Sequence, residues 1–172
     1  MEILRDKDIL FIIAGIGIVP ARPFLRHLME TAERKSKIAV HYSVKTSSDI
    51  LFAAEIENFS KSMHFSISHE LPEVNPQGFS RRVADLIHGC FFMPENTIAL
   101  IFGPATDPIK KAEILTQAGF LGESIFLWME RKMSCGVGHC RHCMIDHVFV
   151  CREGPLLSLG SLSGLHEVRM IA

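Results

Sequence analysis

The feature that most constrains the fold is a series of short apolar runs, each followed by a segment with helical periodicity. The first run, rich in isoleucine, has the pattern of a strand buried on both faces. The predicted strands are Ile9–Ile13, Lys37–Val44, Met63–Ser68, Thr97–Phe102 and Ser124–Met129. Strands that alternate with helices predict a doubly wound α/β fold, here a five-stranded parallel sheet covered on both sides.

Residues between the strands supply the expected helices. The first should carry Pro20 or Pro23 in its first turn, where the missing N–H of proline costs nothing. The others are a helix capped by Ser48 and Asp49 that includes Leu51 and Phe52, a short helix over Ser80–His88, and one that begins at Asp107 and Pro108 and ends at Gly119. Polar residues alternate with apolar ones over 63–68, which places that strand near the sheet edge.

Length and composition exclude several classes of protein. A chain of 172 residues has room for one domain and a small addition. A net charge of −1 gives no electrostatic basis for binding nucleic acid. The apolar stretch Ile9–Ala21 is too short to span a bilayer, and residues 1–8 do not resemble a secretory signal, so we expect a cytoplasmic protein without a membrane span.

Four of the five cysteines follow one another closely near the end of the chain. Cys135, Cys140, Cys143 and Cys151 have the spacing C-x4-C-x2-C-x7-C. The first three cysteines match the C-x4-C-x2-C opening of plant-type [2Fe-2S] sites. Gly136 and Gly138 would let the loop curl around a cluster and bring N–H groups close to its sulfides. The sequence therefore predicts that these four thiolates bind a [2Fe-2S] cluster.

The alternative for the same thiolates is a structural zinc site that borrows a nearby histidine. Zinc sites are usually built from two short-spaced cysteine pairs, and this segment contains one such pair. Cys90, beside Phe91 and Phe92, is interpreted as a small hydrophobic residue. No helical or strand period persists beyond residue 130, so we expect an α/β domain over 1–130 and a loop-built cluster segment over 131–172.

A glycine-bearing turn follows the first predicted strand. Gly15, Ile16 and Gly17 lie where a nucleotide pyrophosphate can meet N–H groups at a helix N-terminus. Pro20 stands where the dinucleotide fingerprint has its third glycine, so a tight turn without a ligand is the alternative. Ser43 and Thr46, and then Gly103 and Pro104, follow two other strands at the carboxyl edge, where such folds bind ligands. These eight residues are the predicted nucleotide contacts.

Together these segments resemble the ferredoxin-NADP reductase-like oxidoreductases, in the branch with a C-terminal [2Fe-2S] domain. That branch includes sulfhydrogenase gamma subunits, anaerobic sulfite reductase B subunits and the electron-transfer subunits of dihydroorotate dehydrogenase. Residues 13–20 are similar to its A-G-G-x-G-x-x-P loop, and residues 129–155 to its E-R-x-M-x-C-G-x-G-x-C-x-H-C…V-C-x-D-G-P ending. Residues 42–52 resemble Y-G-x-R-T…D-L-x-F, with Lys45 for the arginine, and 102–104 resemble C-G-P, with Phe102 for the cysteine beside the nicotinamide.

The resemblance implies an electron-transfer subunit of a multisubunit oxidoreductase. Electrons would pass from NAD(P)H to FAD, and then singly through the [2Fe-2S] cluster to a catalytic subunit. The family's FAD-binding barrel has no counterpart before the first strand, so we expect FAD on a missing domain or on a partner chain. The alternative is a non-catalytic iron-sulfur relay or assembly subunit whose α/β domain no longer binds nucleotide, which Ala14, Lys45 and Phe102 favour.

Overall fold

The computed structural model describes residues 6–30, 36–69, 85, 92–104 and 107–165. Cys90 lies outside these ranges, as does the helix expected over Ser80–His88 apart from Asp85. No helix in the described part of the chain is both long and apolar enough to cross a membrane.

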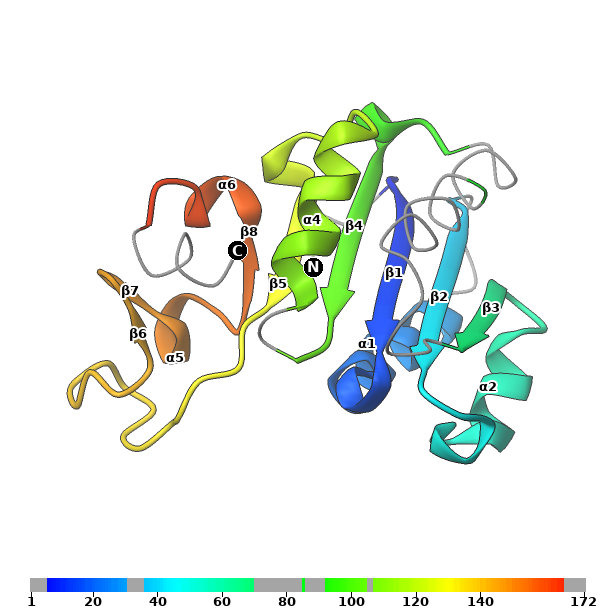
Figure 1. Ribbon diagram of the computed structural model, residues 1–172, viewed down its shortest axis with the longest axis horizontal. Coiled ribbons are helices and arrows are strands. Elements are labelled where there is room, and N and C mark those ends of the chain that lie inside the picture. Colours follow the sequence, from blue (N-terminus) through cyan, green and yellow to red (C-terminus); the bar gives the residue numbers. More distant parts are fainter. Residues whose placement is uncertain (1–5, 31–35, 70–84, 86–91, 105–106, 166–172) are drawn as a thin grey trace.

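A six-stranded sheet in the order β3-β2-β1-β4-β5-β8 forms the centre of the molecule (Figure 1). Its parallel strands are β1 (Asp8–Ala14), β2 (Ile38–Val44), β3 (His64–His69), β4 (Thr97–Phe102) and β5 (Ile125–Trp128). The five predicted parallel strands are thus confirmed, with β3 at one edge. The pattern did not predict β8 (Leu156–Ser158), which pairs antiparallel with β5 and makes the sheet mixed.

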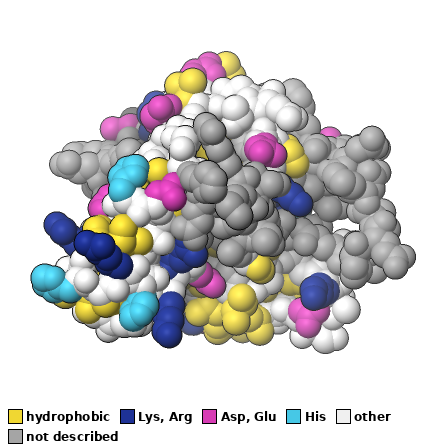
Figure 2. Space-filling model, turned by 60° about the vertical axis from the view of Figure 1, so that its left-hand side comes forward, with side chains coloured by type: hydrophobic (Ala, Val, Ile, Leu, Met, Phe, Trp, Pro, Cys, Tyr) yellow, Lys and Arg dark blue, Asp and Glu magenta, His cyan; other side chains and the backbone are white. Residues whose placement is uncertain are grey.

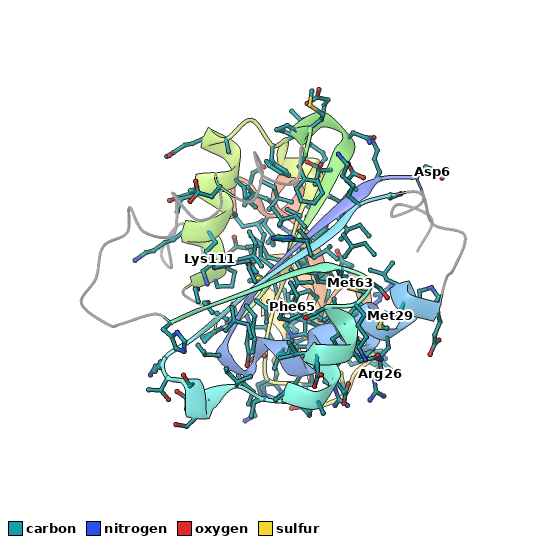
Figure 3. The ribbon with its side chains drawn as sticks, turned by 90° about the vertical axis from the view of Figure 1, so that its right-hand side faces the viewer. Asp6, Arg26, Met29, Met63, Phe65 and Lys111 are labelled. Atoms are coloured by element: carbon teal, nitrogen blue, oxygen red, sulfur yellow. The ribbon has the colours of Figure 1, made fainter. Side chains whose placement is uncertain are left out.

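Helices cover both faces of the sheet, which explains the uninterrupted apolar runs of its strands. Alternate residues of β1 enter opposite cores, Phe11 on one side and Ile12 on the other, and both are fully buried. α1 (Ile18–Glu30) and α2 (Ala53–Phe59) cover the Phe11 side, and α4 (Asp107–Gln117) covers the Ile12 side. Figure 3 shows this layering, with Met29 and Lys111 on opposite sides of the sheet.

One of the two helix starts after β1 and β2 differs from that expected. α1 begins at Ile18, so Pro20 lies in its first turn as predicted, and Pro23 lies inside the helix, where it removes one backbone hydrogen bond. After β2, Ser47–Asp49 form only a 3-10 turn, and α2 begins at Ala53 because Phe52 takes a left-handed φ of 58°. Leu51 and Phe52 therefore precede the helix, contrary to the prediction.

The loop-built segment expected beyond residue 130 also contains several short helices and strands. Short elements occupy this segment: β6 (Met144–Ile145), β7 (Val148–Phe149), α5 (Val150–Glu153), β8 and α6 (Leu159–Leu162). The strands have two or three residues each and exist through their pairing, so they leave no periodic pattern in the sequence. Ile145, Val150 and Leu157 share one core with residues of α4 and β5, so the cysteine segment packs directly against the sheet.

Candidate functional site

The glycine turn is η2 (Gly15–Gly17), a 3-10 turn between the end of β1 and the start of α1. Gly15 has φ +49°, and no atom lies within 4 Å of the position that a Cβ would occupy. A Cβ on Gly17 would lie 2.6 Å from both the carbonyl carbon and the carbonyl oxygen of Phe102. Gly17 is therefore required because the turn crosses directly over the end of β4.

The structure brings the other predicted nucleotide residues to the same edge of the sheet. Ser43 is the register partner of Ala14, and a Cβ on Gly103 would lie 3.0 Å from the Cβ of Ala14. Ile16 and Pro104 are exposed beside them, and Pro20 is half-buried in the first turn of α1. The carboxyl ends of β1, β2 and β4 thus form one rim.

Two polar side chains on this rim already have partners. Ser43 is buried, and its hydroxyl donates to the carbonyl oxygen of Ile13 at 3.2 Å. The backbone N–H and the hydroxyl of Thr46 both donate to Asp49 Oδ2, at 2.9 and 2.8 Å. Ser43 therefore fixes β2 against β1, while Thr46 shapes the turn that follows β2.

Phe102 directs its ring away from the rim and into the core. The ring is fully buried, stacks on Phe11 at a centroid distance of 6.1 Å, and contacts Phe24 and Trp128 at 5.8 and 5.7 Å. It therefore fills the space between α1 and the sheet, and only the Phe102 backbone borders the glycine turn. The substitution of Phe102 for cysteine adds packing to the core without placing a ring on the exposed rim.

Arg22, in α1, is fixed by α2. Its guanidinium donates to both carboxylate oxygens of Glu55, at 2.6 and 3.1 Å, and lies 3.8 Å above the ring of Phe52. Arg22, together with Arg26, holds the pKa of Glu55 below its ordinary value. A hollow of about 460 Å³, lined by Arg26, Met29 and Phe59 among others, lies between the same two helices. This side of α1 is therefore engaged with α2.

The four clustered cysteines form two pairs of thiols. Those of Cys135 and Cys140 lie within hydrogen-bonding reach of each other, as do those of Cys143 and Cys151. The charge of Cys135 also contributes, as the smallest of the causes, to the raised pKa of Cys151. Cys135 is exposed and Cys143 is buried, which places the group at the surface of the C-terminal segment.

Backbone N–H groups surround the exposed pair. Those of His139, Cys140 and Val137 point at Cys135 Sγ, at 3.3, 3.4 and 3.5 Å. They lower the pKa of Cys135, with the N–H of Cys140 the largest cause. The N–H of His142 is the main reason that the pKa of Cys140 is about 7. In contrast, hydrogen bonding to Cys143, followed by burial, raises the pKa of Cys151.

Two glycines make this convergence of N–H groups possible. Gly136 and Gly138 have φ values of +70° and +80°, in the region that side chains disfavour, and both lie between Cys135 and Cys140. This loop fits a binuclear iron-sulfur centre, because its N–H groups can stabilise thiolates and sulfides that carry negative charge.

Within the described residues, no three His, Cys, Asp or Glu side chains come together closely enough to hold one ion. A structural zinc ion needs four ligands around one point, whereas two pairs of thiols would suit two metal atoms with two protein ligands each.

The surroundings of the cysteines are basic. Residues 131–145 contain no aspartate or glutamate, although the whole chain has 19. Lys132, Arg141 and Arg152 are exposed there, together with His139 and His142. Figure 2 shows Lys, Arg and His side chains gathered on one part of the face that carries this segment.

Comparisons with known proteins agree with both halves of the structure. Residues 11–105, more than half of the chain, match the family described as "Oxidoreductase NAD-binding domain". The chain belongs to this family. Residues 130–163 match the "Iron-sulfur cluster binding domain of dihydroorotate dehydrogenase B". The resemblance to iron-sulfur members of the ferredoxin reductase-like oxidoreductases is confirmed.

Relatives of this NAD-binding oxidoreductase domain come from electron-transfer complexes. The chain is 29% identical to sulfhydrogenase 2 subunit gamma of Pyrococcus furiosus, covering 92% of the chain and 61% of that protein. It is 27% identical to a probable dihydroorotate dehydrogenase B (NAD(+)) electron transfer subunit of the same organism, covering 90% and 56%. The chain thus spans less than two thirds of the length of these relatives.

Solved structures support the fold. The NADH-dependent reduced ferredoxin-NADP oxidoreductase aligns with a TM-score of 0.63 and 18% identity, covering 97% of this chain and 61% of that one. At this identity the likeness shows that the two chains share a fold. It extends over the C-terminal segment as well as the parallel sheet.

Sequence reasoning missed two arginines beside the candidate sites. Arg22 pairs with Glu55, which is 33 positions away, and no local spacing predicts such a partner. Arg152 packs against Gly138, and the only sequence signal for it was its place directly after Cys151. Both contacts depend on how separate elements fold together.

Proposed function

We propose that this chain is the electron-transfer subunit of a multisubunit oxidoreductase. In this proposal it relays electrons from NAD(P)H, through a flavin on a missing domain or a partner chain and then through its own [2Fe-2S] cluster, to a catalytic subunit. The names of its sulfhydrogenase and dihydroorotate dehydrogenase relatives support this role. The flavin is needed because NAD(P)H gives up two electrons as hydride, whereas the cluster transfers one electron at a time.

The observation that carries the proposal is the pairing of thiols in a segment joined to the nucleotide-type sheet. In our assignment Cys135 and Cys140 hold one iron, and Cys143 and Cys151 hold the other. β8 attaches this segment to β5, and the N–H of Met129 donates to the carbonyl oxygen of Pro155 at 2.8 Å. This attachment would hold the cluster at a fixed place relative to the sheet.

We assign nucleotide binding to the rim at the carboxyl ends of the strands. The turn of Gly15, Ile16 and Gly17 would face the pyrophosphate with the N–H groups of Ile16 and Gly17, since the N–H of Ile18 already donates to the carbonyl oxygen of Gly15. The proposed contacts also include Pro20, Ser43, Thr46, Gly103 and Pro104. We further propose 1–130 and 131–172 as the functional units, and a cytoplasmic location, which the free thiols of the four clustered cysteines support.

Isolation of the native complex tests this function. The proposal predicts that a flavin-containing chain and a redox-catalytic chain co-purify with this protein, and that NADH or NADPH bleaches its visible iron-sulfur absorption. The Gly17→Val variant, which would block the turn, should lose this reduction while dithionite still reduces the cluster. A complex without flavin, or one in which neither nucleotide reduces the cluster, would contradict the proposal.

A second candidate is a relay subunit that binds no nucleotide. The occupied hydroxyls of Ser43 and Thr46 favour it, because they leave fewer polar groups on the rim for a ligand. Calorimetric titration of the isolated chain with NADH and NADPH separates the two candidates. Heat of binding that disappears in Gly17→Val supports the first, and no binding of either nucleotide at millimolar concentration supports the second.

A further inference from the structure

Arg152 lies directly against the glycine loop. A Cβ placed on Gly138 would come 2.5 Å from Arg152 Cδ, 3.4 Å from Cγ and 3.6 Å from Nη1. The aliphatic part of Arg152 therefore occupies the space that any side chain at position 138 would need.

Gly138 is thereby held from two consecutive positions of α5. Its backbone N–H lies within hydrogen-bonding reach of Cys151 Sγ, and its Cα faces the stem of Arg152. The next residues of the same loop, His139 and Cys140, direct their N–H groups at Cys135 Sγ. A movement of Gly138 would therefore disturb the N–H contacts to Cys151 Sγ and to Cys135 Sγ.

The charge of Arg152 also suits this position. Four thiolates around two irons and two sulfides give a centre with net negative charge, which nearby cations stabilise, and more so after it gains an electron. Among the residues that the structure describes, Glu55 forms ion pairs with Arg22 and Arg26, far from this loop in the sequence. A guanidinium within reach of Gly138 therefore adds positive charge where the cluster would need it.

We propose that Arg152 is a positioning residue for the iron-sulfur centre. Its stem clamps Gly138 so that the loop keeps its N–H groups on the cysteine sulfurs, and its guanidinium raises the reduction potential of the cluster. This inference rests on the proposed function, because it requires the four cysteines to hold a cluster.

Three substitutions separate the two roles. Arg152→Met keeps an aliphatic stem without the charge, Arg152→Lys keeps the charge, and Arg152→Ala removes both. Lys110→Met, at an exposed position of α4, controls for the change in net charge. Each protein is reconstituted anaerobically with iron and sulfide. The midpoint potential is then measured by spectroelectrochemistry, and cluster loss to an iron chelator is followed by visible absorption.

Arg152→Met and Arg152→Ala should shift the potential to more negative values, lowering the equilibrium constant for reduction by roughly two- to fivefold, as expected for one screened charge. Arg152→Lys and Lys110→Met should keep the wild-type potential. Arg152→Ala should lose its cluster about tenfold faster than wild type, the size of effect seen for groups that orient metal ligands, whereas Arg152→Met should stay close to wild type.

Different results would overturn the role of Arg152 and the proposed function. A potential unchanged in Arg152→Met would overturn the electrostatic role, and an unchanged rate of cluster loss in Arg152→Ala would overturn the clamp. Both results concern Arg152 and leave the proposed function standing. A wild-type protein that takes up neither iron nor sulfide would overturn the proposed function and this inference with it.

Discussion

Gly17 and Phe102 are in contact through their backbones, at the point where the turn after β1 crosses the end of β4. A Cβ on Gly17 would lie 2.6 Å from the Phe102 carbonyl, closer than real side chains approach. Phe102 cannot retreat, because its ring is stacked between Phe11 and Trp128 in the core. The rim of the candidate nucleotide site is therefore fixed by the packing of the sheet beneath it.

Gly17→Ala should both destabilise the fold and change the shape of the rim at the carboxyl ends of β1, β2 and β4. The added methyl group forces β1 and β4 apart, at a cost of about 1–3 kcal/mol, typical of overpacking. Urea unfolding measures this loss. Gly15→Ala is the matched control, because it meets no atoms within 4 Å and its cost comes from its φ of +49°, about 1–2 kcal/mol. Equal nucleotide affinity in wild type and Gly17→Ala would contradict the assigned rim.

Leu157→Ala should weaken the sheet and the cysteine segment at once. Leu157 is 6% exposed, pairs with Leu127 across β8 and β5, and belongs to the core shared with α4. Its truncation should lower the free energy of unfolding by about 2–5 kcal/mol and reduce cluster uptake. Leu121→Ala, at a leucine that is 64% exposed, should change stability by less than about 0.5 kcal/mol. Normal stability of Leu157→Ala would show that the segment is not anchored by this core.

How much of this structure the sequence predicts depends on whether an element carries its own pattern. The five parallel strands do, because burial on both faces requires runs such as Ile9–Ile13. β8 does not, because it has three residues and forms only against β5. The start of α2 was missed for a similar reason: the left-handed φ of Phe52 is fixed by its surroundings, which include the guanidinium of Arg22.

In the candidate sites, too, the sequence predicts features that depend on local spacing and misses contacts between separate elements. Spacing alone grouped the four cysteines and placed Gly15 and Gly17 at the sheet edge. It could not show that Phe102 turns its ring into the core, or that Arg152 covers Gly138, because those contacts join residues from different elements.

Glu55→Gln should make stability less dependent on pH in the acid range. Arg22 and Arg26 lower the pKa of Glu55 in the folded protein, so its carboxylate stabilises the fold above the ordinary glutamate pKa of about 4.3. That contribution is lost as pH falls through the lowered value. Wild type should therefore exceed Glu55→Gln in thermal midpoint at pH 7, with the difference shrinking below about pH 4.

The matched control for Glu55 is Glu57→Gln, an exposed glutamate on the same helix. Thermal midpoints of the three proteins are compared at several pH values and at low and high salt. Because the pair is partly exposed, added salt should reduce the difference at Glu55. A Glu55 difference that is the same at pH 7 and pH 3 would contradict the assigned ion pair.

Cys140→Ser should abolish a stable cluster, because it removes one of two ligands from one iron. Cys90→Ser should retain the cluster, since Cys90 lies outside the spaced group of four. Visible absorption after anaerobic reconstitution compares the two variants with wild type, and circular dichroism confirms that each is folded. Full cluster absorption in Cys140→Ser, or its loss in Cys90→Ser, would mean that the ligands are assigned to the wrong cysteines.

The central claim, that four cysteines of this chain hold a [2Fe-2S] cluster, is tested most directly by iron and acid-labile sulfide analysis of anaerobically purified protein. Our account predicts about two irons and two sulfides per chain, with an electron paramagnetic resonance signal from one unpaired electron after reduction. A colourless protein that contains one zinc per chain and no acid-labile sulfide would contradict it.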